Sequence, residues 1–382
     1  MRYLTAGESH GPKLVGILEG IPAGVPVSKE KMDQALQDRQ KGPGRGGRMM
    51  IEKDEVNILS GVRGGLTTGA PIALEILNRD WANWEKIMAS GSEADCESRK
   101  VIAPRPGHAD LTGSLKYRTE VRNVLERASA RETAMRVAIG NIALQILAEL
   151  GVEVRGQVIS VGRVQLQLED SPEFWDRVER SEWKVGDSSG EDALNDQLKL
   201  ARTEGESLGG ILEIQVRNLP AGLGSYVQWD RKLDGRLAQA ILSVQAMKGI
   251  SFGLGFEAGK RFGSEVHDPI GYEQGQGYYH FGNNAGGIEG GMTNGEPIVL
   301  QAVMKPIPTL YRPLKTVNLE TKEPMEASIE RSDVCAVPAA LTVLKHVVAW
   351  EILQAVLEKF PADTLDELRQ SWGNYQKYLR EQ

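Results

Sequence analysis

The stretch from Ser129 to Gly151, SARETAMRVAIGNIALQILAELG, decides the fold around which the rest of the chain is organised. Ser129 and Glu132 have the spacing of a capping box, in which each side chain satisfies a free backbone donor of the first helical turn. Gly151 is typical of the residue that follows a helix. The sequence therefore predicts a core helix roughly 30 Å long. Its apolar residues recur at helical spacing, at Met135, Ile139, Ile142, Ile146 and Leu150.

Three more helices and six strands are predicted outside this stretch. In the run 210–216, Leu212, Ile214 and Val216 alternate with polar residues, which predicts a strand with one buried face. The helices cover 231–248 before Gly249, Pro338 through Ile352, and the residues after a Thr364–Glu367 capping box. The strand-like runs are Leu14–Ile21, Val56–Val62, Pro71–Leu77, Val152–Val164, Gly210–Val216 and Pro297–Met304.

Turn signals around Gly61–Gly69 and at Asn294-Gly295 indicate hairpins, and hairpins bring antiparallel pairing. Helices and hairpins are grouped without strict alternation, so the sequence predicts the α+β class over a doubly wound sheet. The length of 382 residues permits one large domain or two to three ordinary ones. Because no repeat or obvious linker interrupts the chain, we expect one domain over 1–382, with an acidic helical excursion around 169–206.

The composition is that of a soluble globular protein, with 41% hydrophobic and 25% charged residues. It excludes disordered, collagen-like and disulfide-scaffold proteins. Cys96 and Cys335 are far apart and fit a reduced compartment. The first twenty residues lack a continuous apolar core, and no apolar run approaches the ~20 residues that a membrane span needs. We therefore expect a cytoplasmic protein with no membrane partner.

The net charge of −7 is concentrated in residues 169–206, which hold twelve acidic and five basic side chains. The remainder is balanced and contains two basic concentrations. Residues 39–50 carry four basic side chains and no acid, and residues 105–136 carry seven basic side chains against four acidic ones. Local positive charge in an acidic protein favours a small anionic ligand over a nucleic-acid surface.

Two motif matches lack the structural context that they need. Residues 42–47 match G-x-G-x-x-G, but they follow a predicted helix, and Thr67 stands where a dinucleotide site needs an acid. Residues 7–11, GESHG, match the G-x-S-x-G nucleophile elbow, but only six residues precede them, too few to build a sheet. A serine hydrolase stays as a weak alternative. Zinc-ligand patterns do not occur, so no metal site is predicted.

Two of the five histidines are candidates for acid–base chemistry. His10 and His108 each lie in a polar segment beside glycine, GESHG and RPGHAD, and imidazole exchanges a proton near neutral pH. His346 lies in an apolar helix and is interpreted as a structural core residue. Each isolated histidine, taken alone, is more often structural than catalytic.

The arginines indicate where an anion binds. In the 42–48 loop, glycines expose backbone N–H groups while Arg45 and Arg48 supply forked donors. Arg127 and Arg131 flank Ser129 at a helix start, where the dipole also favours an anion. Residue chemistry alone thus predicts an enzyme for a multiply anionic small molecule. Solvated surface is the interpretation given to Arg118, Arg122 and Arg136.

At these residues the chain resembles the chorismate synthase family. The matching segments, in the same order, are GESHG at 7–11, RPGHAD at 105–110, RASARETAMR at 127–136, QAMKG at 245–249, NNAGGIEGG at 283–291, KPIPT at 305–309 and RSDVCAVP at 331–338. The resemblance spans nearly the whole chain. Ala128-Ser129 departs from a serine pair in the family pattern, so a hydroxyl contact from position 128 is lost while backbone contacts survive.

The resemblance implies a lyase that converts 5-enolpyruvylshikimate 3-phosphate to chorismate and phosphate by a 1,4-anti elimination in the shikimate pathway. It implies a need for reduced FMN without net redox change, a β–α–β sandwich and a homotetramer. Two sources of reduced flavin stay open: NADPH used by the chain itself, or a separate flavin reductase. A nucleic-acid or polyanion binder using the 39–50 loop stays as a non-enzymatic alternative.

Family roles carry over to individual positions. His10 is similar to the group that assists the departing phosphate, His108 to the group that manages the flavin proton, and Asp333 to an acid near the C6 hydrogen that is removed. The substrate carries a phosphate and two carboxylates, which explains the arginines. Substrate contacts are expected from Arg39, Arg45, Arg48, Arg105 and Arg131. Flavin contacts are expected from Arg127, Ala128, Ser129, Gln245, Ala246, Gly290, Lys305, Pro306, Ile307, Pro308, Thr309 and Arg331.

Overall fold

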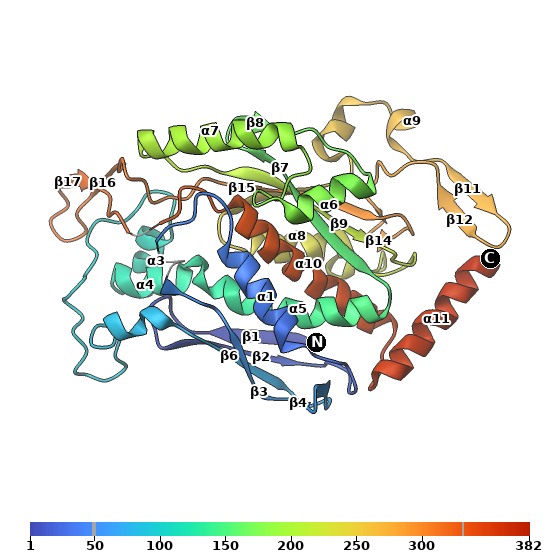
Figure 1. Cartoon of the computed structure of the whole chain (residues 1–382), viewed down its shortest axis with the longest axis horizontal. Coiled ribbons are helices and arrows are strands. Elements are labelled where there is room, and N and C mark those ends of the chain that lie inside the picture. The colour runs from blue at the N-terminus through green and yellow to red at the C-terminus, as the bar shows by residue number, and fades with distance from the viewer. Residues whose placement is uncertain (48–50, 331) are drawn as a thin grey trace.

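Two antiparallel sheets enclose a layer of helices in this computed structural model, which describes residues 1–47, 51–330 and 332–382 (Figure 1). The first sheet has the order β1-β2-β6-β3, and the second has the order β10-β15-β9-β7-β8. The first contains β1 Arg2–Ala6, β2 Lys13–Glu19, β6 Ile72–Leu77 and β3 Val56–Ser60. The second contains β10 Met247–Phe252, β15 Ile298–Met304, β9 Gly210–Arg217, β7 Glu153–Val161 and β8 Val164–Gln165. The predicted α+β class is confirmed.

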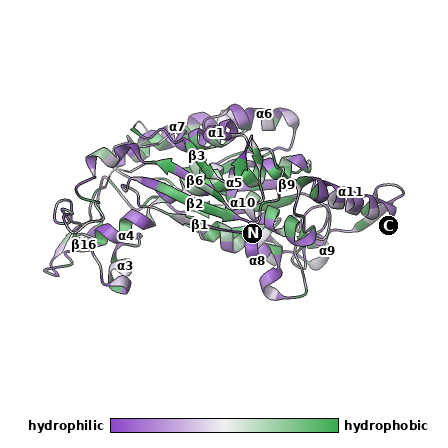
Figure 2. Ribbon diagram, turned by 90° about the horizontal axis from the view of Figure 1, so that it is seen from below, coloured by the Kyte–Doolittle hydropathy of each residue, from purple (hydrophilic) through white to green (hydrophobic). Residues whose placement is uncertain are grey.

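The middle layer is built on α5 Thr133–Glu149 and α10 Val337–Lys359, which pack against each other and against opposite sheets. α1 Lys29–Gln40 and α8 Leu233–Leu242 complete it. Hydrophobic residues are concentrated in α5, α10 and the inner strands, while the peripheral helices are mainly hydrophilic (Figure 2). Side chains such as Ile142 and Leu344 are completely buried, and each contributes about 1.5–3 kcal/mol. One continuous core of buried side chains spans both sheets.

The remaining elements are short or peripheral. Helices α3 Asp110–Tyr117 and α4 Val121–Ala128 lie at one end, and α11 Leu365–Glu381 extends from the other (Figure 1). The acidic stretch forms α6 Pro172–Arg180 and α7 Ser188–Glu204. The other helical elements are α9 Gly263–Val266 and the 3₁₀ turns Arg79–Asn83, Ala130–Glu132, Trp229–Arg231 and Gly255–Lys260. Four two-stranded hairpins complete the described chain: β4 Val62–Arg63 with β5 Leu66–Thr67, β11 Ile270–Glu273 with β12 Gly277–His280, β13 Ile288–Glu289 with β14 Met292–Thr293, and β16 Lys315–Val317 with β17 Pro324–Glu326.

Most predicted elements are present, and the Thr364–Glu367 capping box forms as expected. The Ser129–Glu132 capping box was a wrong prediction. Ser129 caps a 3₁₀ turn through the backbone N–H of Arg131, and α5 begins only at Thr133. Glu132 instead accepts hydrogen bonds from Thr5 and Arg136, so its carboxylate is not available to a cap.

Two further predictions are corrected. The helix predicted over 231–248 ends at Leu242, because Ala246 takes a left-handed φ of 69° and the chain continues as β10, paired with β15. The predicted one-sided burial of β9 is wrong as well. Glu213 and Gln215 are buried on its other face, where Gln157 and Gln215 donate to Glu213 and so replace water.

The expectation that no segment approaches the length of a membrane span was also wrong. α10 has 23 residues and is apolar enough for a span by length and composition alone. In the structure, 78% of its most apolar window is buried between the two sheets. A core helix that is buried all round carries the same composition, so α10 is explained by its place in the fold.

Candidate active site

A cavity of about 920 Å³ opens at the end of the helical layer, and eight segments of the described chain line it. They are the β1–β2 turn, the end of α1 with the 42–47 loop, the 84–101 segment, the 105–109 turn before α3, α4 with the α4–α5 junction, the α8–β10 junction, the segment after β15, and the segment before α10 with the first turns of that helix. Its volume lies within the range of small-molecule sites. Fifteen predicted residues line it: His10, His108, Asp333, Arg39, Arg45, Arg105, Arg131, Ala128, Ser129, Gln245, Ala246, Lys305, Ile307, Pro308 and Thr309.

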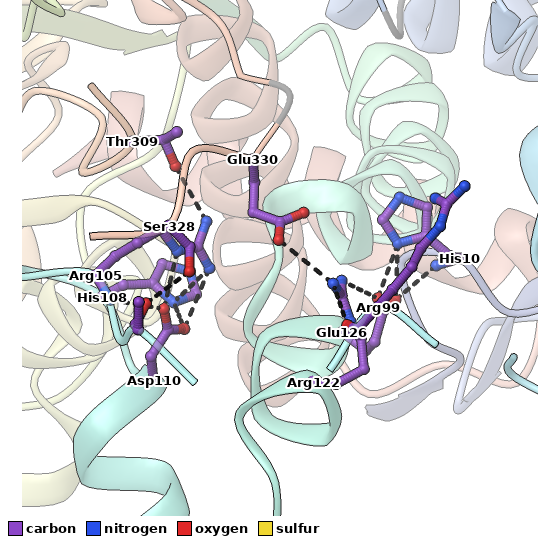
Figure 3. A network of polar contacts seen from close by, with 11 residues as sticks. His10, Arg99, Arg105, His108, Asp110, Arg122, Glu126, Thr309, Ser328 and Glu330 are labelled. Atoms are coloured by element: carbon purple, nitrogen blue, oxygen red, sulfur yellow. Dashed lines mark hydrogen bonds and ion pairs between the residues drawn. The ribbon is translucent and has the colours of Figure 1, made fainter. Parts of the chain in front are cut away.

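His10 is held through its Nδ1 atom by the buried carboxylate of Glu126 on α4 (Figure 3). The two Nδ1–oxygen distances are 2.8 and 3.1 Å, and the backbone N–H of His10 donates to the same carboxylate. Burial acts to raise the pKa of Glu126, but hydrogen bonds from His10 and the charge of Arg122 lower it overall. Glu126 is therefore an anion facing Nδ1, and Nε2 is the ring nitrogen left for a ligand.

His108 has a carboxylate partner of its own. Its Nδ1 contacts Asp110, the first residue of α3, whose side chain is completely buried (Figure 3). Arg105 donates to both oxygens of Asp110, and its Nη1 donates to Thr309. Burial opposes ionisation of Asp110, yet the hydrogen bonds and charges of His108 and Arg105 lower its pKa well below the usual range. Both candidate histidines thus have Nδ1 on a buried carboxylate.

Arg39 and Arg131 form a buried cationic pair on the cavity wall. Arg39, from the last turn of α1, donates to Thr133 and to the carbonyl of Ala130. Arg131 donates to Asp54 at 2.6 Å. Burial lowers the pKa of Arg39 to about 9, against the opposing charge of Asp54, so Arg39 is a cation at neutral pH. Arg39 Nη1 and Arg131 Nη2 are buried and make no hydrogen bond to the residues described, but they lie 3.7 Å from Asp54 and 3.8 Å from Glu52, respectively. Both guanidinium groups are therefore paired with buried carboxylates.

The loop 42–47, which is rich in glycine and contains Arg45, lies against the segment before α10. Arg45 Nη1 is 2.7 Å from one oxygen of Asp333, and the backbone N–H of Gly46 donates to the other at 2.6 Å. The backbone N–H of Val334 donates to the carbonyl of Gly44. Gly44 has a φ of +86°, and an added Cβ would lie 2.7 Å from Cys335, so this contact requires glycine. Substrate-binding and acid candidates are therefore already in contact.

An apolar wall faces these charged groups. Val244 and Ala246 at the α8–β10 junction and Ile307 and Pro308 after β15 line the cavity. Lys305 donates to the carbonyl of Gly107, and its pKa is lowered by burial and by the charge of Lys248. A cavity with cations on one wall and apolar side chains on another can hold a planar ring together with anionic groups.

Several predicted residues are not in this cavity. Arg127 reaches back to the carbonyls of Thr5 and Gly7 at the end of β1. Gly290 lines a second, smaller cavity of about 310 Å³ beside Asp268. Pro306 is not among the lining residues, although its neighbours are. Arg48 and Arg331 lie outside the residues that the structure describes.

Sequence reasoning missed the groups that hold the histidines. Trp84 stacks on the ring of His10, but nothing in the sequence around it marks it as a site residue. Glu126 is 116 positions from His10. Asp110 had a signal, because it lies two residues after His108 in RPGHAD. The surface interpretation of Arg122 was wrong: its side chain is buried in the cavity wall and donates to the carbonyl of Arg99 and to Glu330. The interpretation of His346 as a core residue agrees with its complete burial.

The two discarded motifs have the wrong structural context. Gly7–Gly11 joins β1 directly to β2, a strand–turn–strand, whereas a nucleophile elbow needs a strand followed by a helix. The 42–47 segment follows α1 rather than a strand. In the described parts of the chain, His, Cys, Asp and Glu form no group of three or more suited to holding a metal ion.

The fold and cavity define a class: an enzyme that binds a polyanionic small molecule between two histidine–carboxylate pairs and buried arginines. The family model "Chorismate synthase" matches residues 1–357. A chorismate synthase from Desulfitobacterium hafniense (strain DSM 10664 / DCB-2) is 78% identical over 382 residues and all of both chains. One from Desulforamulus reducens is 53% identical over 385 residues and all of both chains.

A solved structure described as "Crystal Structure of Chorismate Synthase" superposes with a TM-score of 0.81 at 39% identity, covering 100% of this chain and 98% of the other. The chain belongs to the chorismate synthase family. Its activity is that of a chorismate synthase, a carbon–oxygen lyase that acts on a small-molecule substrate. Neither the hydrolase nor the nucleic-acid binder is supported.

Proposed function

We propose that the 920 Å³ cavity is where 5-enolpyruvylshikimate 3-phosphate loses phosphate, with reduced FMN as the cofactor. The observation that carries this proposal is that two carboxylate-held histidines and two buried arginines line the same cavity. The substrate has three anionic groups, and buried guanidinium groups bind such groups through charge-assisted hydrogen bonds.

The lining fits reduced FMN as well as the substrate. The apolar side chains of Val244, Ala246, Ile307 and Pro308 suit a planar ring, and Ser129 and Thr309 supply hydroxyl groups. When bound, reduced FMN supplies electron density to the elimination without being consumed. We assign flavin binding to the lining residues Ala128, Ser129, Gln245, Ala246, Lys305, Ile307, Pro308 and Thr309.

The roles of the chain's own groups follow from their surroundings. His10 donates a proton or hydrogen bond from Nε2 to the departing phosphate, because Nδ1 is engaged by Glu126. His108 holds or moves the proton of the reduced flavin. Asp333 accepts the C6 proton, which requires its oxygens to be released from Arg45 and Gly46.

The arginines divide into two groups. Arg39, Arg45 and Arg131 bind the substrate, since all three guanidinium-bearing residues line the cavity and a cation is the group that an anionic substrate needs there. In Arg105, Nε, Nη1 and Nη2 are all engaged. Arg105 contacts substrate only if it gives up one of these bonds, so its main contribution is to hold Asp110 and His108.

The test of this function is anaerobic turnover of the purified protein with substrate and chemically reduced FMN. Phosphate release without stoichiometric flavin oxidation is the expected result. Equal phosphate release without flavin would overturn the cofactor proposal.

His10→Ala should lower turnover by about 10²–10⁴-fold while both ligands still bind. His108→Ala should also change the pH titration of bound reduced flavin, and identical titrations in both variants and the parent would contradict the assigned roles.

We further propose that the chain is a cytoplasmic homotetramer. Support comes from apolar residues on the outer face of the first sheet, where Leu4 and Ile17 are paired across β1 and β2 and are 73% and 50% exposed. Phe256 and Phe262 on the segment between β10 and β11 are also exposed. Apolar surface of this kind is typical of subunit contacts. Light scattering of the purified protein should give four times the chain mass, and a monomer at micromolar concentration would contradict the tetramer.

A further inference from the structure

His10 is enclosed on two sides by groups that its own motif does not contain. On one side, Glu126 accepts from the backbone N–H of His10 at 2.8 Å and contacts Nδ1 through both oxygens. The backbone carbonyl of Glu126 also accepts a hydrogen bond from the N–H of Ser9, at 3.0 Å. α4 is thus tied to the GESHG turn by three backbone and side-chain contacts.

On the other side, the imidazole ring stacks on Trp84 with ring centroids 3.9 Å apart and planes inclined by 23°. The guanidinium of Arg99 lies 4.1 Å from the centroid of the Trp84 ring, and that of Arg122 lies 5.2 Å from it. Arg122 also lies within 3.4 Å of Glu126 and of Glu330 (Figure 3). The stack on Trp84 fixes the plane of the ring, and a 180° flip within that plane would break both Nδ1 contacts to Glu126.

The chemistry of these contacts selects one tautomer. A carboxylate only accepts hydrogen bonds, so the His10 nitrogen that faces Glu126 must carry a proton. With Nδ1 protonated, Nε2 is the atom that gains or releases a proton, and His10 lines the cavity. A buried carboxylate that orients a catalytic imidazole in this way controls activity without touching the substrate.

We propose that Glu126 is the positioning residue of His10: it keeps Nδ1 protonated and turns Nε2 toward the departing phosphate. The Glu126 carboxylate also favours the imidazolium, from which Nε2–H is donated. This inference rests on the proposed role of His10. The side chain of Glu126 has no exposed surface, so it does not touch a ligand itself and reaches the cavity through His10 and Arg122.

Glu126→Gln is the informative variant, because it keeps the size of the side chain and removes one acceptor. The backbone N–H of His10 is an obligatory donor, so the single oxygen of glutamine is expected to remain on it. The amide NH₂ then faces Nδ1, which must accept, so the single ring proton lies on Nε2 and the imidazolium cannot form. A neutral Nε2–H is a far weaker acid toward the departing phosphate than an imidazolium. We expect kcat to fall about 10²–10⁴-fold, with KM within a few-fold of the parent.

The direct measurement is the ¹⁵N NMR spectrum of His10 at a pH where the imidazole is neutral. The parent should show Nδ1 protonated, and Glu126→Gln should show Nε2 protonated. Glu132→Gln is the matched control: Glu132 is also buried, lies six residues along the same segment and bonds to Thr5 and Arg136. It should change thermal stability but neither the His10 tautomer nor kcat by more than about two-fold.

The outcomes separate this inference from the proposed function. If His10→Ala retains full turnover, the role of His10 fails whatever Glu126 does. If His10→Ala is inactive while folded Glu126→Gln keeps the Nδ1–H tautomer and a normal kcat, the inference about Glu126 is overturned. Should Glu126→Gln not fold, Glu126→Asp retains an acceptor-only group and should keep the Nδ1–H signature. An Nε2–H tautomer in Glu126→Asp together with unchanged kcat would also refute the inference.

Discussion

Arg45 and Asp333 form an ion pair of 2.7 Å although 288 residues separate them in sequence. The family resemblance assigns Arg45 to substrate binding and places Asp333 near the flavin N5, where the C6 hydrogen is removed. Under the proposed function, Asp333 accepts that proton once its oxygens are released from Arg45 and Gly46. We therefore propose that binding of the substrate by Arg45 and release of Asp333 are coupled.

Arg45→Ala should therefore weaken substrate binding more than it weakens the fold. Loss of one partner from a charge-assisted pair costs about 2–5 kcal/mol, and the substrate KM should rise at least 10-fold on that basis. Steady-state kinetics with reduced FMN measure this, and the flavin affinity serves as an internal reference. Arg2→Ala, which removes an exposed ion pair with Glu19, is the control and should leave KM unchanged.

Arg105→Ala should behave in the opposite way. The change leaves the completely buried carboxylate of Asp110 without its two arginine donors, and breaking a buried pair costs about 3–5 kcal/mol. Urea unfolding of the two alanine variants measures the difference. The loss should be clearly smaller for Arg45→Ala, because the Asp333 side chain is 20% exposed and water replaces the lost donor. Equal losses of unfolding free energy would contradict the separation.

His346 should make the protein less stable in mild acid. Burial lowers the pKa of this imidazole from 6.5 to about 4, while the hydrogen bond to the carbonyl of Thr342 opposes the shift. Below pH 6.5 the unfolded chain binds a proton here that the native chain excludes, so stability is present above that pH and is lost as the pH falls toward 4. The slope approaches about 1.4 kcal/mol per pH unit. His346→Gln should lack this component, and identical slopes in parent and variant between pH 6.5 and 4 would be evidence against it.

The crossing of α5 and α10 should depend on Gly140. An added Cβ there would lie 2.3 Å from the backbone carbonyl oxygen of His346, so the helices would have to separate. Gly140→Ala should cost about 1–3 kcal/mol or more. Gly373→Ala in α11 is the control: a Cβ there meets nothing within 4 Å, and alanine is the better helix former by about 1 kcal/mol. Thermal unfolding should move in opposite directions in the two variants.

Local sequence signals predicted the elements whose residue pattern can be recognised within a short window of the chain. The Thr364–Glu367 capping box, the six strands and the apolar α10 are examples. The box at Ser129 failed because Glu132 finds partners on β1 and within α5. The helix over 231–248 was extended too far because a strand partner, β15, supplies the backbone hydrogen bonds from Met247 onward. In both cases a long-range contact replaced a local one.

For the site, the sequence by itself determined which residue types are present: two histidines beside glycine, several arginines, and motifs in the order of one family. Only the tertiary structure decided which of them act together. It brings His10 onto Glu126 and Trp84, His108 onto Asp110, and Arg45 onto Asp333, while it turns Arg127 toward β1 and places Gly290 in another cavity. The physical reason is that hydrogen bonds and ion pairs form only at distances of about 3 Å. Between residues that are far apart in sequence, such distances are set by the packing of the two sheets against α5 and α10. No local sequence pattern encodes that packing.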